Sequence, residues 1–243
     1  MIDINHIINT VFCVDCIEFM KTIPDKSIDL ICTDAPYQFI SKGEKQLIGG
    51  GFMEQHNKIH IQSIKKTFGI NYDPIQYLNE CKRICKIFNG YFFTNKTLLK
   101  DYIGFAEENK YNWELMIYSK SNPCPLNKNH YLFDKEYAVF IKDKGATFNS
   151  NLGYNKYFTV QKYSIQNKSG HPTEKPLNMI KGFIEVSSNK NDIVFDGYIG
   201  SGTTAIACIE TGRNFIGCEI HPDYHKMALS RISTLQQQPT LNF

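Results

Sequence analysis

The chain is predicted to fold as an α/β domain around a mostly parallel β-sheet, on three observations. Strand-like and helix-like segments alternate along its length, which is the pattern of parallel strands joined by crossover helices. Residues 28–33 form a continuous apolar run, as expected of a strand buried on both faces. Residues 192–196 form another predicted strand, which leads into a glycine-rich turn and a helical pattern. A chain of 243 residues has the length of one such domain with a small insert.

Each element is placed by its apolar periodicity and by the turn or cap residues at its ends. The predicted strands cover residues 10–14, 28–33, 90–94, 113–119, 137–142, 192–196 and 214–219. The predicted helices cover residues 17–22, 73–88, 97–109, 176–187, 203–211 and 222–235. Two polar stretches lie between them. Residues 38–70 are predicted to form a long mobile loop, and residues 143–170 an irregular segment.

The net charge is only +3, but the lysines are unevenly distributed. Residues 41–70 contain five lysines and two glutamates, and residues 118–170 contain eight lysines and three acidic residues. Such stretches are typical of a surface that follows a phosphate backbone, although a solvated lysine-rich face would have the same composition. No apolar run approaches the length of a membrane span, and the N-terminus has no signal-peptide pattern. We therefore expect a cytoplasmic protein.

The eight cysteines are scattered, which in a cytosolic protein indicates reduced thiols. The spacing of Cys13 and Cys16 is compatible with a zinc site, but a matching second pair of ligands is absent. Cys81 and Cys85 fall in a predicted helix, where their spacing is typical of thiols that face the core. No metal site is predicted.

A glycine-rich turn joins the predicted strand 192–196 to the predicted helix 203–211. It reads Asp196-Gly197-Tyr198-Ile199-Gly200-Ser201-Gly202-Thr203-Thr204. Glycines in this position let a ligand approach the backbone at the start of a helix. Glu219 ends the next strand, where a carboxylate can accept hydrogen bonds from both hydroxyls of a ribose. The pattern predicts a site for a ribose nucleoside.

The spacing of Gly200, Gly202 and Ala205 also satisfies the dinucleotide-binding fingerprint. Two observations argue against a nicotinamide enzyme. Only one predicted strand follows the turn, so the rest of the sheet must come from earlier in the chain. In addition, Asp196 at the strand end would repel a pyrophosphate but would suit a cationic ligand. S-adenosylmethionine, which carries a sulfonium and an ammonium, is such a ligand.

A second polar group follows the predicted strand 28–33, at a strand end where sites form in parallel sheets. Its sequence is Thr33-Asp34-Ala35-Pro36-Tyr37. Asp34 offers hydrogen-bond acceptors, Pro36 keeps the preceding residue extended, and Tyr37 offers a stacking face. These groups could hold a planar amine, although an ordinary exit from strand to turn could have the same Asp-x-Pro pattern.

The chain resembles the DNA methyltransferases that methylate exocyclic amines, in the beta class, where the catalytic motif precedes the cofactor motif. The Asp-Pro-Pro-Tyr motif of that family is matched by residues 34–37, with Ala35 in place of the first proline. Its Asp-Pro-Phe-x-Gly-Ser-Gly-Thr-Thr motif is matched by residues 196–204, with Gly197 and Tyr198 as departures. Its Gly-Asp-Cys, Pro-Asp-x-Ser-x-Asp and His-Pro-Thr-x-Lys-Pro motifs are similar to residues 14–16, 24–29 and 171–176.

The resemblance implies a Rossmann-like, mostly parallel sheet of the S-adenosylmethionine-dependent methyltransferase type, with circularly permuted motif order. It implies a site-specific enzyme that transfers a methyl group from S-adenosylmethionine to the N6 amine of a flipped-out adenine in double-stranded DNA. The catalytic residues would be Asp34, Ala35 through its carbonyl, Pro36 and Tyr37. The cofactor would be bound by Asp15, Cys16, Thr173, Lys175, Asp196, Gly197, Tyr198, Gly200, Ser201, Gly202, Thr203, Thr204 and Glu219. His171 is expected to be structural, because direct methyl transfer needs no strong base.

By the same resemblance, the middle of the chain would contact the DNA. Residues 1–243 would form a single methyltransferase domain, with residues 38–70 as a mobile DNA-contacting loop and residues 120–168 as a small target-recognition insert. The candidate DNA contacts are Lys42, Lys45, Lys65, Lys66, Lys120 and Asn122. A homodimer and a cognate restriction endonuclease are further partners that such an enzyme could have.

Three alternatives stay open. The chemistry allows the N4 amine of cytosine, but Asp34 favours adenine, because the family more often has Ser at this position for cytosine. The altered motifs allow a DNA-binding protein without methyltransferase activity. A protein-glutamine methyltransferase is less consistent with the sequence, because its motif begins with Asn and usually follows the cofactor motif.

Overall fold

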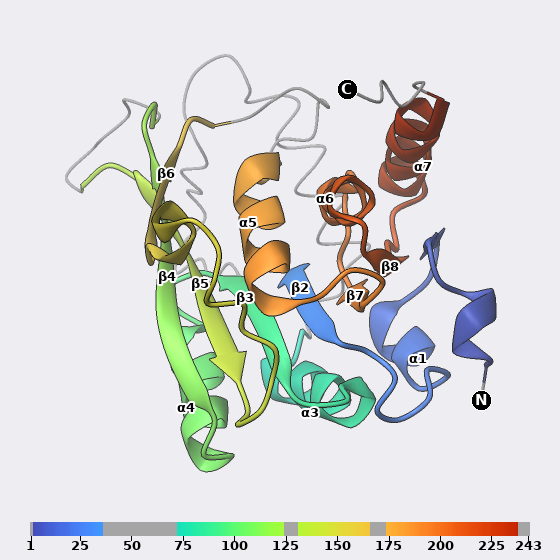
Figure 1. Cartoon of the computed structure of the whole chain (residues 1–243), viewed down its shortest axis with the longest axis horizontal. Coiled ribbons are helices and arrows are strands. Elements are labelled where there is room, and N and C mark those ends of the chain that lie inside the picture. The colour runs from blue at the N-terminus through green and yellow to red at the C-terminus, as the bar shows by residue number, and fades with distance from the viewer. Residues whose placement is uncertain (1, 36–71, 124–130, 166–173, 238–243) are drawn as a thin grey trace, which may run out of the picture.

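The computed structural model of the chain describes residues 2–35, 72–123, 131–165 and 174–237. These residues form one central sheet with helices on both of its faces (Figure 1). One face is covered by α1 (Cys16–Met20), α3 (Pro74–Ile84) and α4 (Leu99–Glu108). The other is covered by α5 (Leu177–Ser187), α6 (Thr203–Thr211) and α7 (Pro222–Gln237). Among the described helices, none has the length and apolar character to cross a membrane.

Eight strands of the described residues form the sheet, in the spatial order β1-β8-β7-β2-β3-β5-β4-β6. They are β1 (Thr10–Phe12), β2 (Leu30–Asp34), β3 (Asn89–Thr94), β4 (Asn112–Lys120), β5 (Lys135–Lys142), β6 (Val160–Tyr163), β7 (Ile193–Asp196) and β8 (Asn214–Cys218). β5 runs antiparallel to β3 and β4, and the other neighbouring pairs are parallel. The predicted α/β class with a mostly parallel sheet is confirmed.

The topology places β2 directly beside β7, although they come from opposite ends of the chain. Ile31 of β2 and Phe195 of β7 are register partners in a parallel pair. Because parallel strands end at the same edge of a sheet, Asp34 and Asp196 both lie at this edge. The fold thereby brings the two sequence motifs together.

The structure differs from the predicted elements at the end of one helix. Helix α3 ends at Ile84 and not at residue 88, because Cys85 adopts an extended conformation. The Lys86 N–H then donates a hydrogen bond to the Ile28 carbonyl at 2.8 Å. Pairing with the chain that enters β2 therefore overrides the helical periodicity of the sequence.

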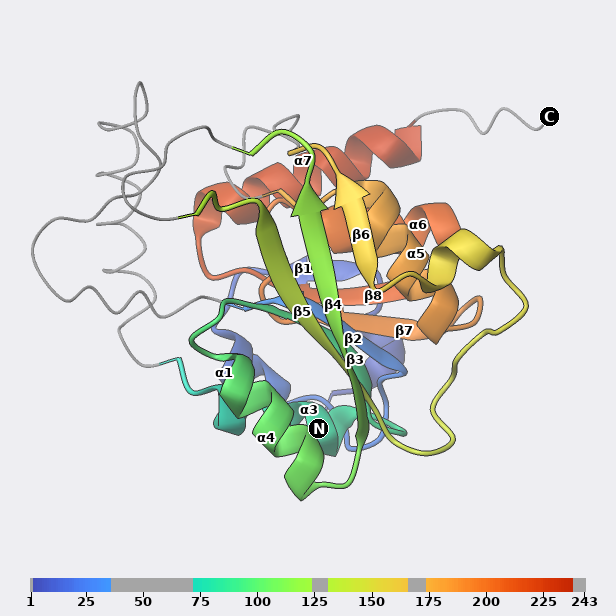
Figure 2. The same ribbon diagram turned by 90° about the vertical axis from the view of Figure 1, so that its left-hand side faces the viewer.

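The prediction that residues 143–170 are irregular throughout is wrong, because they contain β6 and a short 3₁₀ helix at Tyr154–Tyr157. β6 pairs with β4 at the edge of the sheet (Figure 2). It has four residues, half of them exposed, and its sequence Val-Gln-Lys-Tyr has no clear apolar alternation. Edge strands of this kind give little sequence signal.

The core lies in two apolar clusters, one on each face of the sheet. Cys81 and Cys85 belong to the cluster beneath α3 and are buried, in agreement with the expectation that they face the core. The predicted loop 38–70 lies outside the described residues. So do residues 124–130 and 166–168 of the predicted insert 120–168. Its other residues include β5, which lies between β3 and β4, and the edge strand β6.

Candidate active site

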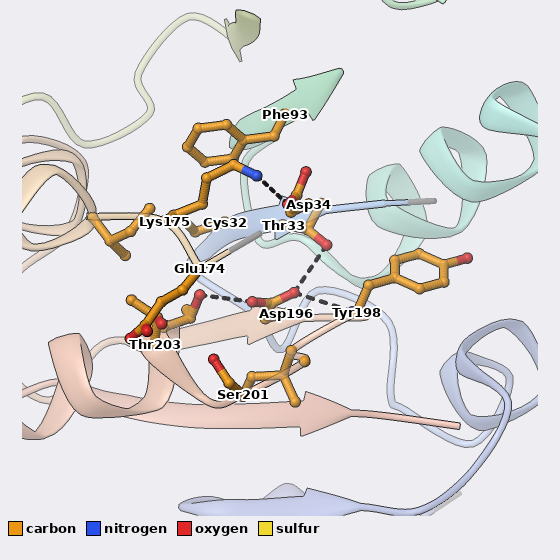
Figure 3. Close-up of a pocket in the computed structure, with 14 residues that line it drawn as sticks. Cys32, Thr33, Asp34, Phe93, Glu174, Lys175, Asp196, Tyr198, Ser201 and Thr203 are labelled. Atoms are coloured by element: carbon orange, nitrogen blue, oxygen red, sulfur yellow. Dashed lines mark hydrogen bonds and ion pairs between the residues drawn. The ribbon is translucent and has the colours of Figure 1, made fainter. Parts of the chain in front are cut away.

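A cavity lies at the carboxyl ends of β2 and β7 (Figure 3). Its lining includes Asp34 from the end of β2 and Asp196 from the end of β7. Lys175, just before α5, and the glycine-rich turn before α6 complete it. The cavity is thus shared by the predicted catalytic and cofactor motifs.

Asp196 is the central hydrogen-bond acceptor of the glycine-rich turn. Its buried carboxylate accepts a hydrogen bond from the Thr33 hydroxyl on β2 at 2.9 Å. It also accepts from the Thr204 hydroxyl at 2.6 Å and from the Tyr198 N–H at 3.1 Å. Burial raises the pKa of Asp196 to about 6, although these three donors act to lower it. A cation in the cavity would stabilise the ionised carboxylate.

The backbone of the turn requires glycine at two positions. Gly200 and Gly202 have φ angles of 53° and 85°, a region that residues with a Cβ rarely adopt. A Cβ on Gly202 would also lie 3.1 Å from the Cβ of Ala228 in α7. The turn leads into α6, whose first turn contains Thr203 and Thr204.

Gly197 stands where the resembling family has proline, and its neighbours explain the difference. A Cβ at Gly197 would overlap the Cys16 Sγ and lie 2.9 Å from the Tyr77 hydroxyl oxygen. Both of these residues are buried. The ring of Tyr198 packs against that of Tyr77, with centroids 5.4 Å apart. Tyr77 and Cys16 therefore occupy the space that a larger residue would need.

Glu219 lies directly after β8 and is buried. Its carboxylate oxygens accept hydrogen bonds from the Gly200 N–H at 3.0 Å and from the His221 N–H at 2.7 Å. Burial raises the pKa of Glu219 above its ordinary value, against the effect of these donors. The carboxylate fixes the glycine-rich turn, and its remaining lone pairs can accept further hydrogen bonds.

Ser201 is held by residues that the sequence did not indicate. Arg231 of α7 donates to the Ser201 carbonyl at 2.7 Å and to its hydroxyl at 2.8 Å. The same guanidinium pairs with Glu174 at 2.7 Å. Asp15, a predicted cofactor residue, caps α1 by accepting a hydrogen bond from the Glu18 N–H at 3.0 Å.

Lys175 extends to the predicted catalytic residue. Its buried ammonium forms an ion pair with the Asp34 carboxylate (Figure 3). The same nitrogen lies 3.2 Å from Oε2 of Glu136 and 5.2 Å from the ring centroid of Phe93. Lys175 therefore lies between the carboxyl end of β2 and the strand β5.

Glu136 was not predicted as a site residue. Its Oε1 lies 2.7 Å from the Lys120 nitrogen, so the carboxylate lies between two lysines. Burial acts to raise the pKa of Glu136, but Lys175 and Lys120 overcome this effect and hold it at about 2. No sequence signal marks Glu136, because only the antiparallel insertion of β5 beside β3 brings it to this edge.

Several predicted site residues lie outside the described residues: Pro36, Tyr37, Lys42, Lys45, Lys65, Lys66 and Thr173. His171, which was expected to be structural, also lies outside them. Ala35 is described and is buried directly after β2. Of the candidate DNA contacts, Lys120 pairs with Glu136, and the Asn122 side chain accepts a hydrogen bond from the Ile165 N–H at 2.6 Å. Within the described ranges, no three His, Cys, Asp or Glu side chains are arranged to hold a metal ion.

Comparison with known proteins identifies the family. Residues 28–230 match the family described as DNA methylase, which comprises adenine-N6 and cytosine-N4 methyltransferases. The chain belongs to this family, so the resemblance seen in its motifs is confirmed. Members of the family use S-adenosylmethionine, and the chain is therefore an S-adenosylmethionine-dependent DNA methyltransferase.

Two curated relatives cover most of the chain. The Type II methyltransferase M.HinfI of Haemophilus influenzae is 30% identical, over 98% of this chain and 72% of its own length. The DNA adenine methyltransferase YhdJ of Escherichia coli (strain K12) is 28% identical, over 90% of this chain and 80% of its own length.

Solved structures share the fold. The complex of M1.HpyAVI with S-adenosylmethionine has a TM-score of 0.65 and 25% identity, and the match covers 91% of this chain and 98% of that one. The cytosine-N4-specific PvuII DNA methyltransferase has a TM-score of 0.70 at 16% identity, with 91% and 85% covered. The predicted methyltransferase type of fold is thus confirmed.

Proposed function

We propose that this chain methylates the N6 amine of adenine in DNA. The observation that carries the proposal is the position of Asp34, a carboxylate at the end of β2 that lines the same cavity as the glycine-rich turn. In the family, Asp at this position goes more often with adenine and Ser with the cytosine amine. The relative YhdJ is named as a DNA adenine methyltransferase, which supports the same choice.

The described residues suit S-adenosylmethionine. Asp196 puts a buried carboxylate on the cavity, which suits the sulfonium and the ammonium of the cofactor. The glycine-rich turn allows a ligand to approach the backbone, and Glu219 lies at the strand end from which a ribose is bound. The proposed cofactor-binding residues are those predicted from the sequence, Asp15, Cys16, Thr173, Lys175, residues 196–198 and 200–204, and Glu219.

The protein's contribution to the reaction is positioning and electrostatics. S-adenosylmethionine, when bound, would supply an electrophilic methyl group and leave as S-adenosylhomocysteine, and the proton lost by the methylated amine would pass to water. Asp34 accepts one amine hydrogen and the Ala35 carbonyl accepts the other, which orients the nitrogen lone pair. The charge of Asp34 also stabilises the positive charge that develops on the nitrogen.

The amine of a paired adenine cannot be reached inside a duplex, so the base rotates out of the helix into this site. Tyr37 would stack on its ring. The loop 38–70 and the insert 120–168 are the proposed DNA-contacting parts, with Lys42, Lys45, Lys65, Lys66, Lys120 and Asn122 as the proposed contacts. A homodimer and a cognate restriction endonuclease stay predictions.

The test is the base composition of DNA from cells that express the chain. Digestion to nucleosides and mass spectrometry should find N6-methyladenine, and cells expressing the Asp34→Ala variant should lack it. N4-methylcytosine without N6-methyladenine would overturn the choice of base. DNA binding without any methylated base would instead identify a DNA-binding protein that has lost the activity.

A further inference from the structure

Two segments that are distant in sequence meet at the cavity, and one arginine contacts both of them. Glu174 and Lys175 belong to the segment before α5, and Ser201 belongs to the glycine-rich turn. All three line the cavity (Figure 3). Arg231 of α7 is not among the described residues that line it, but its guanidinium binds Ser201 and Glu174. Arg231 therefore joins two walls of the cavity.

On one wall, Arg231 holds the backbone of the glycine-rich turn. Its Nη1 donates to the Ser201 carbonyl at 2.7 Å and to the Ser201 hydroxyl at 2.8 Å. The Ser201 carbonyl belongs to the same planar peptide unit as the Gly202 N–H, which donates to the Ile199 carbonyl at 2.9 Å. Gly200 and Gly202, on either side of Ser201, both have positive φ angles. Because both ends of this peptide unit are bonded, its orientation within the turn is fixed.

On the other wall, Arg231 forms an ion pair. Its Nη2 lies 2.7 Å from Oε1 of Glu174, whose side chain is only 6% exposed. A hydrogen bond between charged groups is stronger than one between neutral groups. Glu174 directly precedes Lys175, whose ammonium pairs with Asp34. The ion pair therefore anchors the backbone that carries Lys175.

The arginine itself has a fixed origin in α7. Ala228 is fully buried and lies three residues before Arg231, on the same face of the helix. A Cβ on Gly202 would lie 3.1 Å from the Ala228 Cβ, so the helix approaches the glycine-rich turn closely at this point. The planar guanidinium offers several N–H donors in a fixed fork, so it can serve acceptors on two segments at once.

We propose that Arg231 is a positioning residue for the cofactor, which fixes the glycine-rich turn and the segment of Glu174 and Lys175 relative to each other. The inference rests on the proposed function, because it takes both segments as parts of the S-adenosylmethionine site. Arg231 acts through these segments and does not touch the ligand. Its loss should let the two walls of the cavity move independently, so that binding the cofactor must order them again at a cost in affinity.

The experiment measures the dissociation constant of S-adenosylmethionine by calorimetry, beside urea unfolding of the protein without cofactor. Arg231→Met removes the hydrogen bonds but keeps an apolar stem, and should raise the dissociation constant by about tenfold or more. Arg231→Lys keeps the charge but not the fork, and should raise it by about threefold or more. Glu174→Gln should also weaken binding by about threefold in the wild-type background, but by less than about twofold in the Arg231→Met background, where the ion pair is already absent.

A matched control is Arg213→Met. The Arg213 guanidinium also binds backbone carbonyls, those of Thr211 at 2.6 Å and Ser188 at 2.7 Å, and neither residue is among those that line the cavity. Its loss should lower the free energy of unfolding, as the loss of Arg231 should, but it should leave the dissociation constant of S-adenosylmethionine unchanged.

Wild-type affinity in a folded Arg231→Lys or Arg231→Met variant would overturn the inference. An equal loss of affinity in Arg213→Met would also overturn it, because the effect would then be a general consequence of a weakened fold. So would an equal effect of Glu174→Gln in both backgrounds. A wild-type chain that binds S-adenosylmethionine but methylates cytosine and not adenine would overturn the proposed function and not this inference, because the quantity measured here is cofactor binding.

Discussion

The Thr33 hydroxyl donates a hydrogen bond to the Asp196 carboxylate at 2.9 Å, and this bond joins the strand of the catalytic motif to the strand of the cofactor motif. Thr33 directly precedes Asp34 on β2, and Asp196 is the last residue of β7. Both partners are buried. A change in the charge of Asp196 should therefore alter the geometry of both motifs.

Cofactor affinity should depend on the ionisation of Asp196. Because burial raises its pKa to about 6, the carboxylate is charged above that pH and neutral below it. A ligand with a sulfonium and an ammonium favours the charged form, so affinity for S-adenosylmethionine should fall as the pH drops below about 6. Calorimetric titrations across this range measure the change.

Two variants test whether Asp196 causes this pH dependence. Asp196→Asn should bind S-adenosylmethionine weakly, and its affinity should no longer fall below about pH 6. In Glu219→Gln, the affinity should still fall below about pH 6. A wild-type affinity that does not vary with pH would contradict the assignment. The folding stability of the protein without cofactor should depend on pH in the opposite direction to the affinity. Asp196 binds its proton more tightly in the folded state than in the unfolded state. Its contribution to the free energy of unfolding therefore falls as the pH rises from about 4 to about 6.

Replacing Glu219 should weaken cofactor binding more than it weakens the fold. Glu219→Ala removes the proposed acceptor of the ribose hydroxyls, which should cost about 1.5–3 kcal/mol of binding free energy. It also removes the acceptor for the Gly200 and His221 N–H groups, so some loss of stability is expected. Glu219→Gln keeps one carbonyl oxygen and should retain more of the stability than of the affinity. Unchanged affinity in a folded Glu219→Ala variant would refute the ribose role.

A side chain at position 197 should destabilise the protein. The Cβ of a Gly197→Ala variant would overlap Cys16 Sγ and crowd the Tyr77 hydroxyl, at a cost of about 1–3 kcal/mol in the free energy of unfolding. Adding Cys16→Ala removes the sulfur and should recover part of the loss. Urea unfolding of the single and double variants measures both effects. A Gly197→Ala variant as stable as the wild type would show that Cys16 and Tyr77 can move away at little cost in free energy.

DNA binding should weaken steeply with salt, because the lysine-rich stretches imply several phosphate contacts. Replacing Lys65 and Lys66 together by Gln should reduce the slope of log affinity against log salt by up to about 2 if both lysines contact phosphates. Fluorescence anisotropy on a DNA duplex at several salt concentrations gives the slope. A slope that is the same in the wild type and the double variant would exclude these two residues from the DNA-contacting surface.

The parts of the site that are contiguous in sequence could be predicted before the structure. The turn that begins at Asp196 has glycines at positions that demand positive φ, and it follows an apolar strand, so residue type and context agree. Asp34 likewise follows a buried strand. The alternation of elements indicated that the strands are parallel and so end at the same edge of the sheet. That the two motifs meet in one cavity depends on the adjacency of β2 and β7, which the structure shows.

The tertiary partners of these residues could not be predicted in this way. Glu136 stands in an ordinary strand pattern, and its burial depends on where β5 joins the sheet. Lys120 was predicted as a DNA contact from the family resemblance and from its lysine-rich stretch, whereas its ammonium pairs with Glu136. Lys175 was assigned to the cofactor by resemblance, and its ion pair with Asp34 depends on side-chain positions that a motif does not specify. The edge strand β6 was missed because it buries too little to show an apolar period.

Asp34→Ala should abolish methyl transfer while cofactor binding stays largely intact. The carboxylate acts on the target amine, by accepting an N–H and by stabilising the charge that develops on nitrogen, so its loss removes interactions made in the transition state. The Lys175 ammonium keeps its contact with Glu136, 3.2 Å away, and this ion pair should limit the damage to the fold. Asp34→Asn tests the role of the charge alone, because the asparagine side chain keeps the shape and one hydrogen-bond acceptor but lacks the negative charge. Single-turnover transfer to DNA, measured beside calorimetric titration with S-adenosylmethionine, separates the two roles. An Asp34→Ala enzyme that still transfers methyl groups would overturn the mechanism, and equal losses of transfer and of cofactor affinity would move Asp34 to the cofactor.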